Sequence, residues 1–231
     1  MSDDRPAISI IVPLFNEEQS VEPLFKKLMS VLDTGIGEYE IIFVDDGSTD
    51  QSFTQLRRLA ESNKNVSAIG MRRNFGKSAS LQRGFHEARG RIVVTLDADL
   101  QDDPAEIPAL LEKLKQGFDM AVGWKRDRQD PVSKTVPSRL FNVVVSVLTG
   151  VHLHDMNSGL KAMTSDVAKE LRLYGELHRF IPVLAHMRGF SITEVPVRHH
   201  PRKYGRSKFG TSRMYRGFFD LITVLFLTRF G

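Results

Sequence analysis

The spacing of apolar residues along the 231-residue chain predicts strands that alternate with helices. Short apolar or β-branched runs indicate strands over residues 7–12, 39–44, 66–71, 93–96, 119–122 and 191–197. Apolar residues three or four positions apart indicate helices over residues 20–32, 52–62, 76–89, 104–115 and 133–149. This alternation favours an α/β fold, in which a mostly parallel sheet is flanked by helices on both faces.

Polar residues follow three of the predicted strands at the point where each strand ends. Pro13 to Glu17 follow the first, Asp45 and Asp46 follow the second, and Asp97 and Asp99 follow the fourth. Each segment alone is consistent with an ordinary turn or an acidic helix start. Because ligands of a parallel sheet bind beyond the carboxyl ends of its strands, the three together predict a binding site.

The segment Asp97-Ala98-Asp99-Leu100-Gln101 is the centre of that predicted site. Alternate residues of an extended segment point the same way, so Asp97 and Asp99 can face one point, and Gln101 continues the alternation with a neutral oxygen. Clustered hard oxygen ligands suit Mg²⁺ or Mn²⁺. The alternative is an acidic helix start that is capped by Asp102 or Asp103.

Composition and charge narrow the function classes. The chain contains no cysteine, which excludes disulfides and thiolate metal sites. The net charge is only +4, but basic clusters concentrate in the last third, where they indicate an anionic partner or surface. The first residues are polar and do not resemble a secretory signal, and no apolar run reaches the length of about 18 residues that is typical of a membrane span.

Five motifs in order resemble those of family 2 glycosyltransferases with the GT-A fold. The resemblance is to the polyprenyl-phosphate branch, which includes dolichol-phosphate mannose synthases and bacterial undecaprenyl-phosphate glucosyltransferases. It extends over residues 7 to 230, whereas longer members of the family carry transmembrane helices after this point. The motifs are Val12-Pro13-Leu14-Phe15-Asn16-Glu17-Glu18, Val44-Asp45-Asp46-Gly47-Ser48-Thr49-Asp50, Arg73-Asn74-Phe75-Gly76-Lys77, Asp97-Ala98-Asp99-Leu100-Gln101 and Arg202-Lys203-Tyr204-Gly205-Arg206-Ser207-Lys208.

The resemblance implies a site for a nucleotide-sugar donor. It places the nucleoside at Pro13, Phe15 and Glu17, and it places the base and ribose at Val44 and Asp46. It places Mg²⁺ or Mn²⁺ and the diphosphate at Asp97, Ala98, Asp99 and Gln101. Lys125 stands where the mannose synthases have arginine, and either Lys125 or the adjacent Arg126 meets the donor.

The resemblance also implies how the site closes and where the acceptor enters. Arg202 and Lys208 match a basic pair that closes over the diphosphate, and Asp155 matches an acidic residue on the acceptor side. A phosphate acceptor is already ionised near neutral pH, so Asp155 is expected to position the metal, a cation or the sugar rather than to remove a proton. The alternative for Asp155 is a turn that begins a strand. Gly76-Lys77-Ser78 lacks the glycine spacing of a P-loop and is interpreted as a turn and helix start.

The second half of the chain is expected to face a membrane. Residues 1–210 are interpreted as the GT-A domain and residues 211–231 as an amphipathic juxtamembrane helix, with Arg213 and Arg216 ahead of Phe218 and Phe219. The predicted helix 133–149 is either a core helix or a second membrane-surface element. The basic tract 198–208 is interpreted as a lid over the diphosphate rather than as a nucleic-acid site, because no nucleic-acid-binding module surrounds it.

These observations predict a hexosyltransferase that acts at the cytoplasmic face of a membrane. It would transfer a sugar, with inversion, from a nucleotide donor to a polyprenyl phosphate. UDP-glucose is favoured because residues 173–182 resemble the glucosyltransferases, and GDP-mannose is second. Two alternatives remain open: a glycosyltransferase with a soluble or glycan acceptor, and a nucleotide- or nucleic-acid-binding module without turnover.

Overall fold

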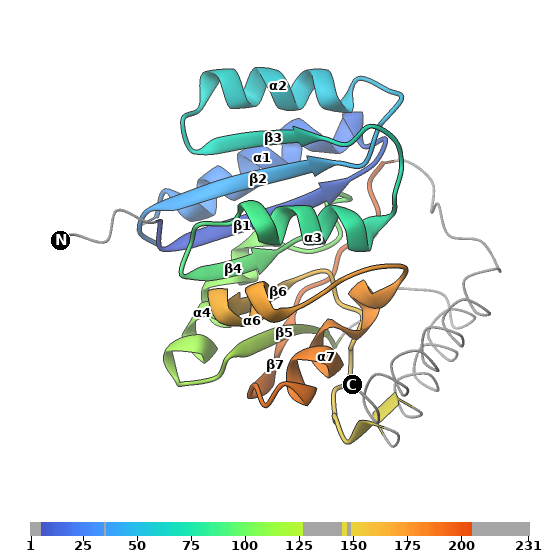
Figure 1. The fold of residues 1–231 in the computed structure, drawn as a ribbon. Helices are drawn as coiled ribbons and strands as arrows, with labels where there is room; N and C mark the ends of the chain where they lie inside the picture. The colour runs from blue at the N-terminus through green and yellow to red at the C-terminus, as the bar shows by residue number, and fades with distance from the viewer. Residues whose placement is uncertain (1–5, 35, 127–144, 147–148, 205–231) are drawn as a thin grey trace.

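The structure is a computed structural model that describes residues 6–34, 36–126, 145–146 and 149–204. Seven strands form one sheet in the order β3-β2-β1-β4-β6-β5-β7, with β3 and β7 at the edges (Figure 1). The strands are β1 (Ile8–Leu14), β2 (Tyr39–Asp45), β3 (Val66–Gly70), β4 (Ile92–Thr95), β5 (Met120–Lys125), β6 (Lys161–Thr164) and β7 (Ile192–Val197).

Helices cover both faces of the sheet. Alternate strand residues point to opposite faces, so Ile10 and Val12 pack in one core and Ile11 packs in the other. The first core lies under α1 (Glu18–Leu32), α2 (Ser52–Ser62) and α4 (Ile107–Lys115), which follows the short 3₁₀ helix η1 (Pro104–Glu106). The second core lies under α3 (Lys77–Glu87), α6 (Ser165–Glu170), η2 (Leu177–Phe180) and α7 (Ile181–Met187) (Figure 1).

The prediction of an α/β fold with a mostly parallel sheet is confirmed, and the structure adds one strand that the sequence did not indicate. Strand β6 runs antiparallel to both of its neighbours, β4 and β5. It has only four residues and begins with Lys161, so it shows neither apolar alternation nor a continuous apolar run. Because β6 starts at the rim where β4 ends, it brings Lys161 to the predicted site.

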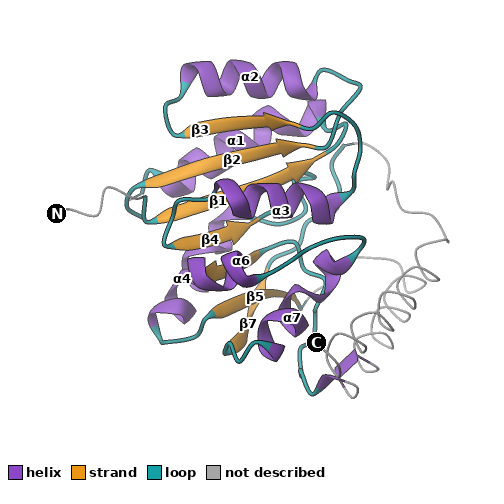
Figure 2. Cartoon of the chain, viewed as in Figure 1, coloured by secondary structure: helices purple, strands orange, loops and turns teal. Residues whose placement is uncertain are grey.

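The loops that follow β1, β2 and β4 emerge at the same rim of the sheet, as the sequence predicted (Figure 2). These three strands are neighbours and parallel, in the order β2-β1-β4. Most of the predicted helix 133–149 and the whole predicted helix 211–231 lie outside the described residues, as does the proposed boundary at residue 210. Among the described helices, none combines the length and apolar character needed to cross a membrane.

Candidate active site

Side chains tie the loops after β1 and β2 to one another. The Asn16 Oδ1 atom accepts a hydrogen bond from the Thr49 amide at 2.8 Å, and the Asn16 amide donates to Ser48 Oγ at 2.8 Å. The Glu17 amide donates to Ser52 Oγ at 2.8 Å. Asn16 has a φ of +52°, a left-handed conformation that asparagine tolerates better than most residues. These hydrogen bonds fix the segment at the sheet rim that carries the predicted nucleoside residues.

A predicted nucleoside residue and a predicted base or ribose residue lie side by side on this rim. Pro13 and Val44 are partners in the β1–β2 register, and both are buried. The two carboxylate oxygens of Asp46 accept the Phe75 and Gly76 amides, each at 2.8 Å. Burial is the largest influence on Asp46 and raises the pKa of its carboxyl group, although these hydrogen bonds oppose it. Asp46 therefore also holds the loop that precedes α3.

Asp97 and Asp99 each have a basic partner. Asp97 Oδ1 lies 2.5 Å from Lys77 Nζ, at the first residue of α3. Asp99 Oδ2 lies 2.6 Å from Arg202 Nη2, and Arg202 Nη1 lies 3.2 Å from Glu17 Oε1. Burial, followed by the charge of Asp97, raises the pKa of Asp99 to about 6 even with Arg202 beside it. The charge of Asp97 thus adds to burial in disfavouring ionisation of Asp99.

The pair Asp97 and Asp99 fits a divalent cation in donor chemistry. Burial and the charge of Asp97 both disfavour ionisation of Asp99, and a bound cation would offset both effects. Within the described ranges, no group of three or more histidine, cysteine, aspartate and glutamate side chains gathers in a metal-binding arrangement. The Gln101 amide Nε2 lies 3.3 Å from His199 Nε2 and donates to the His200 carbonyl at 3.3 Å, so it faces the segment after β7.

Asp102 anchors that segment to the rim. It is only 1% exposed, and its Oδ1 atom lies 3.1 Å from Lys125 Nζ and 3.6 Å from His199 Nδ1. Burial alone would raise the pKa of Asp102, but the charge of Lys125 and the nearby imidazole of His199 together lower it below its usual range. An isolated β-bridge also joins Asp102 to His199, three residues before Arg202. Lys125 thus faces the site, whereas Arg126 is exposed.

Gly159 packs directly against two of these carboxylates. A Cβ atom at this position would lie 2.5 Å from Asp97 Cγ and 2.8 Å from Asp102 Oδ2. The Thr95 hydroxyl at the end of β4 donates to the Gly159 carbonyl at 2.8 Å, which holds the backbone there. Only glycine fits this close approach without moving Asp97.

Lys161 is a buried cation that sequence reasoning missed. Its ammonium group donates to the Ser158 carbonyl, and the residue is 3% exposed. Burial, followed by repulsion from Lys77, lowers the pKa of Lys161 to about 8, although Asp97 and Asp155 oppose the shift. Asp155 is also buried, at 1% exposed. The charges of Lys161 and Asp155 therefore influence one another inside the protein.

The structure brings most of the predicted site residues together. The charged network consists of Glu17, Arg202 and Asp99, which are joined by ion pairs, and of Asp97, whose charge acts on Asp99. Asp97 also pairs with Lys77, and the charges of Asp97 and Asp155 act on Lys125. Phe15 and Ala98 lie within the same strand-end segments. Lys208 lies outside the described residues. Lys77, Asp102 and Lys161 are additional charged members, of which Lys77 belongs to the Gly76-Lys77-Ser78 segment that was interpreted only as a helix start.

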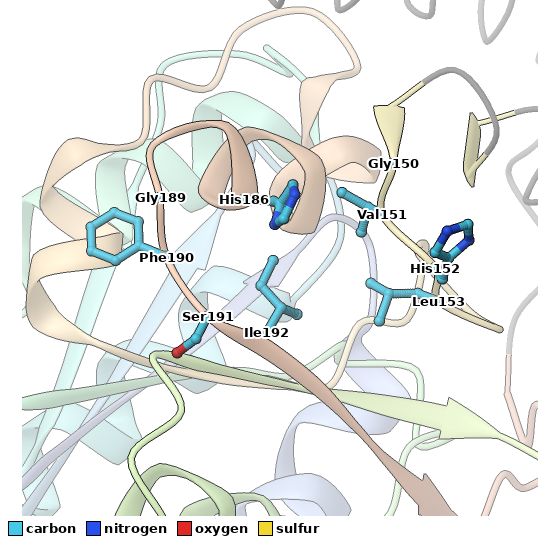
Figure 3. A pocket seen from close by; sticks show the side chains of 9 residues that line it. All are labelled: Gly150, Val151, His152, Leu153, His186, Gly189, Phe190, Ser191 and Ile192. Carbon is cyan, nitrogen blue, oxygen red and sulfur yellow. The ribbon is translucent and has the colours of Figure 1, made fainter.

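A cavity of about 350 Å³ lies elsewhere, near the start of β7. Residues 150–153, His186 and residues 189–192 line it, and Figure 3 shows Val151 between the imidazoles of His186 and His152. This cavity shares no lining residue with the acidic rim. The convergent charges therefore identify the rim, rather than this cavity, as the candidate active site.

The chain is similar in sequence to known sugar transferases. The sequence profile described as Glycosyl transferase family 2 matches residues 9–188. The chain is 39% identical over 228 residues to a dodecaprenyl-phosphate galacturonate synthase from Rhizobium johnstonii, a match that covers 96% of this chain and 68% of that protein. It is 37% identical over 222 residues to an undecaprenyl-phosphate 4-deoxy-4-formamido-L-arabinose transferase from Edwardsiella ictaluri, again covering 96% and 68%.

Solved structures share the fold at lower sequence identity. Glucosyl-3-phosphoglycerate synthase from Mycobacterium tuberculosis, in complex with Mn²⁺, UDP and phosphoglyceric acid, superposes with a TM-score of 0.73 at 20% identity, over 96% of this chain and 78% of that one. A mannosyltransferase from Pyrobaculum calidifontis, in complex with GDP-mannose and Mn²⁺, gives 0.63 at 22% identity, over 88% and 59%. These likenesses confirm the predicted GT-A fold.

Proposed function

Because the chain belongs to glycosyl transferase family 2, we propose that it transfers a sugar from a nucleotide-diphosphate donor to the phosphate of a polyprenyl lipid. The observation that carries the proposal is the network of Asp97, Asp99, Glu17 and Arg202 at the carboxyl ends of β1 and β4. The acceptor class is supported by the names of two relatives that this chain matches over 96% of its length.

On the donor side, the network suits a diphosphate only together with a cation. Asp97 and Asp99 would hold Mg²⁺ or Mn²⁺, and the cation would supply electrostatic stabilisation of the departing nucleoside diphosphate. Arg202 can grip two phosphate oxygens because its guanidinium is planar, and Lys125 supplies a second, buried positive charge. When the donor binds, Arg202 would exchange its contact with Asp99 for contacts with the diphosphate.

On the acceptor side, one lipid phosphate oxygen attacks the anomeric carbon as the bond from that carbon to the nucleoside diphosphate breaks. The attacking oxygen already carries negative charge, so no side chain has to remove a proton. We assign Asp155 to positioning, because it is buried and its charge acts on both Lys125 and Lys161. Attack from the face opposite the leaving group gives inversion.

For the donor, we propose UDP-glucose first and GDP-mannose second, on the resemblance of residues 173–182 to glucosyltransferases. The two relatives are named for galacturonate and for 4-deoxy-4-formamido-L-arabinose, so nucleotide-linked forms of those sugars belong in any test. We place the reaction at the cytoplasmic face of the membrane, with residues 211–231, which lie outside the described residues, at the lipid surface.

The test is a donor panel with one lipid acceptor. Each nucleotide-sugar, labelled in the sugar, is incubated with the protein, Mg²⁺ or Mn²⁺ and undecaprenyl phosphate, and label is counted in the organic phase. The proposal predicts organic-soluble label with at least one donor. Label that stays in a water-soluble product would favour a soluble acceptor. A thermal shift with nucleotide but no transfer to any acceptor would favour a binding module without turnover.

A further inference from the structure

A carboxylate on β7 holds the loop that carries Asp155. Glu194 Oε2 accepts the His154 amide at 2.9 Å and lies 2.8 Å from His154 Nδ1, and Glu194 Oε1 accepts the Asp155 amide at 3.0 Å. The Glu194 side chain is only 12% exposed. Both carboxylate oxygens of this largely buried side chain therefore accept hydrogen bonds from two consecutive residues of the loop.

The loop depends on such contacts because it has little regular structure of its own. Residues 150–160 contain no helix or strand, and they connect to β6 at Lys161. The ring of His154 stacks on Trp124 of β5, with ring centroids 4.2 Å apart and an interplanar angle of 18°. The Glu194 contacts and this stack hold the His154–Asp155 step from two directions, over the β5–β7 edge of the sheet.

We infer that Glu194 is a positioning residue for sugar transfer, which sets where the Asp155 carboxylate stands relative to Lys125 and Lys161. The inference rests on the proposed function and on the role assigned there to Asp155. The charge of Asp155 acts on both lysines, so a displacement of its carboxylate changes the field at each of them.

The position of Glu194 in the sheet also links the two sides of the site. Val122 of β5 is its register partner, and three residues after Glu194 the strand ends and leads to His199 and Arg202. The same strand therefore carries the anchor of Asp155 and leads into the segment that meets Asp99. A shift of β7 would move the acceptor side and the donor side together.

The test variant is Glu194→Gln, and Asp119→Asn is its matched control. In Glu194→Gln, an amide NH₂ replaces one accepting oxygen and faces a backbone N–H, so at least one contact to the loop is lost. Asp119 lies just before β5, where its Oδ2 accepts the Ser191 amide at 2.8 Å and the Ser191 hydroxyl at 2.7 Å. The control removes a similar carboxylate contact between the same two strands, at the end remote from the rim.

The inference predicts a loss of rate without a loss of donor binding. A displacement of about 1 Å can cost about 100-fold, so kcat of Glu194→Gln should fall about 10- to 100-fold while the Kd for the donor nucleotide stays within about 3-fold. Asp119→Asn should keep kcat within about 3-fold of wild type. Trp124 is the only tryptophan in the chain, and its emission should change in Glu194→Gln but not in Asp119→Asn, because only the former frees His154.

A double variant separates positioning from general destabilisation. If Glu194 acts through Asp155, adding Glu194→Gln to Asp155→Asn should lower kcat by no more than about 2-fold further. Independent, multiplicative losses would overturn the inference, as would equal losses in Glu194→Gln and Asp119→Asn, or normal activity of Asp155→Asn. If Glu194→Gln does not fold, Glu194→Asp takes its place in every comparison. Glu194→Asp keeps both accepting oxygens but carries them on a shorter side chain.

The transfer activity of the wild-type protein distinguishes a failure of the proposed function from a failure of the positioning role of Glu194. Wild-type transfer to undecaprenyl phosphate together with a normal Glu194→Gln variant would reject only the role of Glu194. Absence of wild-type transfer to any acceptor would reject the proposed function and the positioning role with it.

Discussion

Replacing Gly159 with alanine should disable the site without removing any charged group. The new Cβ atom would stand 2.5 Å from Asp97 Cγ, whereas ordinary contacts begin near 3.4 Å, so Asp97 or the Gly159 backbone must move by about 0.9 Å. The hydrogen bond from Thr95 to the Gly159 carbonyl opposes movement of the backbone. A displacement of this size can lower kcat about 100-fold, and overpacking of a buried site typically costs about 1–3 kcal/mol of stability.

Gly90→Ala provides a control of matched severity. Its Cβ atom would lie 2.5 Å from the Ser9 amide nitrogen, at the other end of β4, and neither glycine has a left-handed φ. Steady-state transfer rates and urea melts should show comparable losses of stability in the two variants. When the rate is expressed per folded molecule, kcat should fall in Gly159→Ala but not in Gly90→Ala. A Gly159→Ala enzyme with a kcat within about 3-fold of wild type would refute the account of this contact.

Three further predictions concern the charged network. Arg202→Ala should lower kcat by about 100-fold or more in a steady-state transfer assay. Arg202→Lys should recover only part of the lost rate, because an ammonium group cannot bind two phosphate oxygens in a bidentate arrangement. Full recovery would contradict a bidentate role. Lys125→Met should lower the free energy of unfolding at pH 7 by about 3–5 kcal/mol in urea melts, since Asp102 stays charged and buried with only His199 beside it. Adding Asp102→Asn should recover much of that loss, and no recovery would remove the ion-pair explanation. The pKa of Lys161 in the folded protein, about 8, lies below the value of about 10.4 for an unfolded lysine. Between these two pH values the unfolded chain binds more protons than the folded protein does. The free energy of unfolding of the wild type should therefore gain a contribution that rises with pH over this range. Lys161→Met should lack this contribution, and identical pH profiles of the two proteins would contradict it.

The acidic rim could be predicted because it is encoded locally. Asp97 and Asp99 follow a short apolar strand, and a carboxylate at a strand end is visible in the sequence whatever the rest of the chain does. The motif resemblance assigned Glu17 to the nucleoside and Arg202 to the diphosphate, and the structure places the two side chains in contact with one another. The antiparallel strand β6 escaped prediction because four residues led by a lysine give no periodic signal.

Two cations at the rim, Lys77 and Lys161, could not be assigned to the site from the sequence, because their roles depend on tertiary contacts. Lys77 begins a helix and pairs with Asp97, which lies 20 residues away. Lys161 is buried, which is rare for a lysine and is not visible in a sequence window. Glu194 occupies an ordinary strand position, and only the fold brings it to the His154–Asp155 loop, 39 residues away. Close packing at Gly159 likewise appears only once Asp97 and Asp102 are placed.

The most direct test of the central claim measures both products of the reaction at once. Wild-type protein and Asp99→Ala are incubated with the preferred donor, undecaprenyl phosphate and Mg²⁺ or Mn²⁺, and nucleoside diphosphate and glycolipid are quantified together. The account predicts equal amounts of the two products from wild type, with near-complete loss of both in excess EDTA and in Asp99→Ala, while Asp99→Ala keeps a cooperative melting curve. Near-normal turnover in excess EDTA, or nucleoside diphosphate without an equal amount of glycolipid, would contradict it.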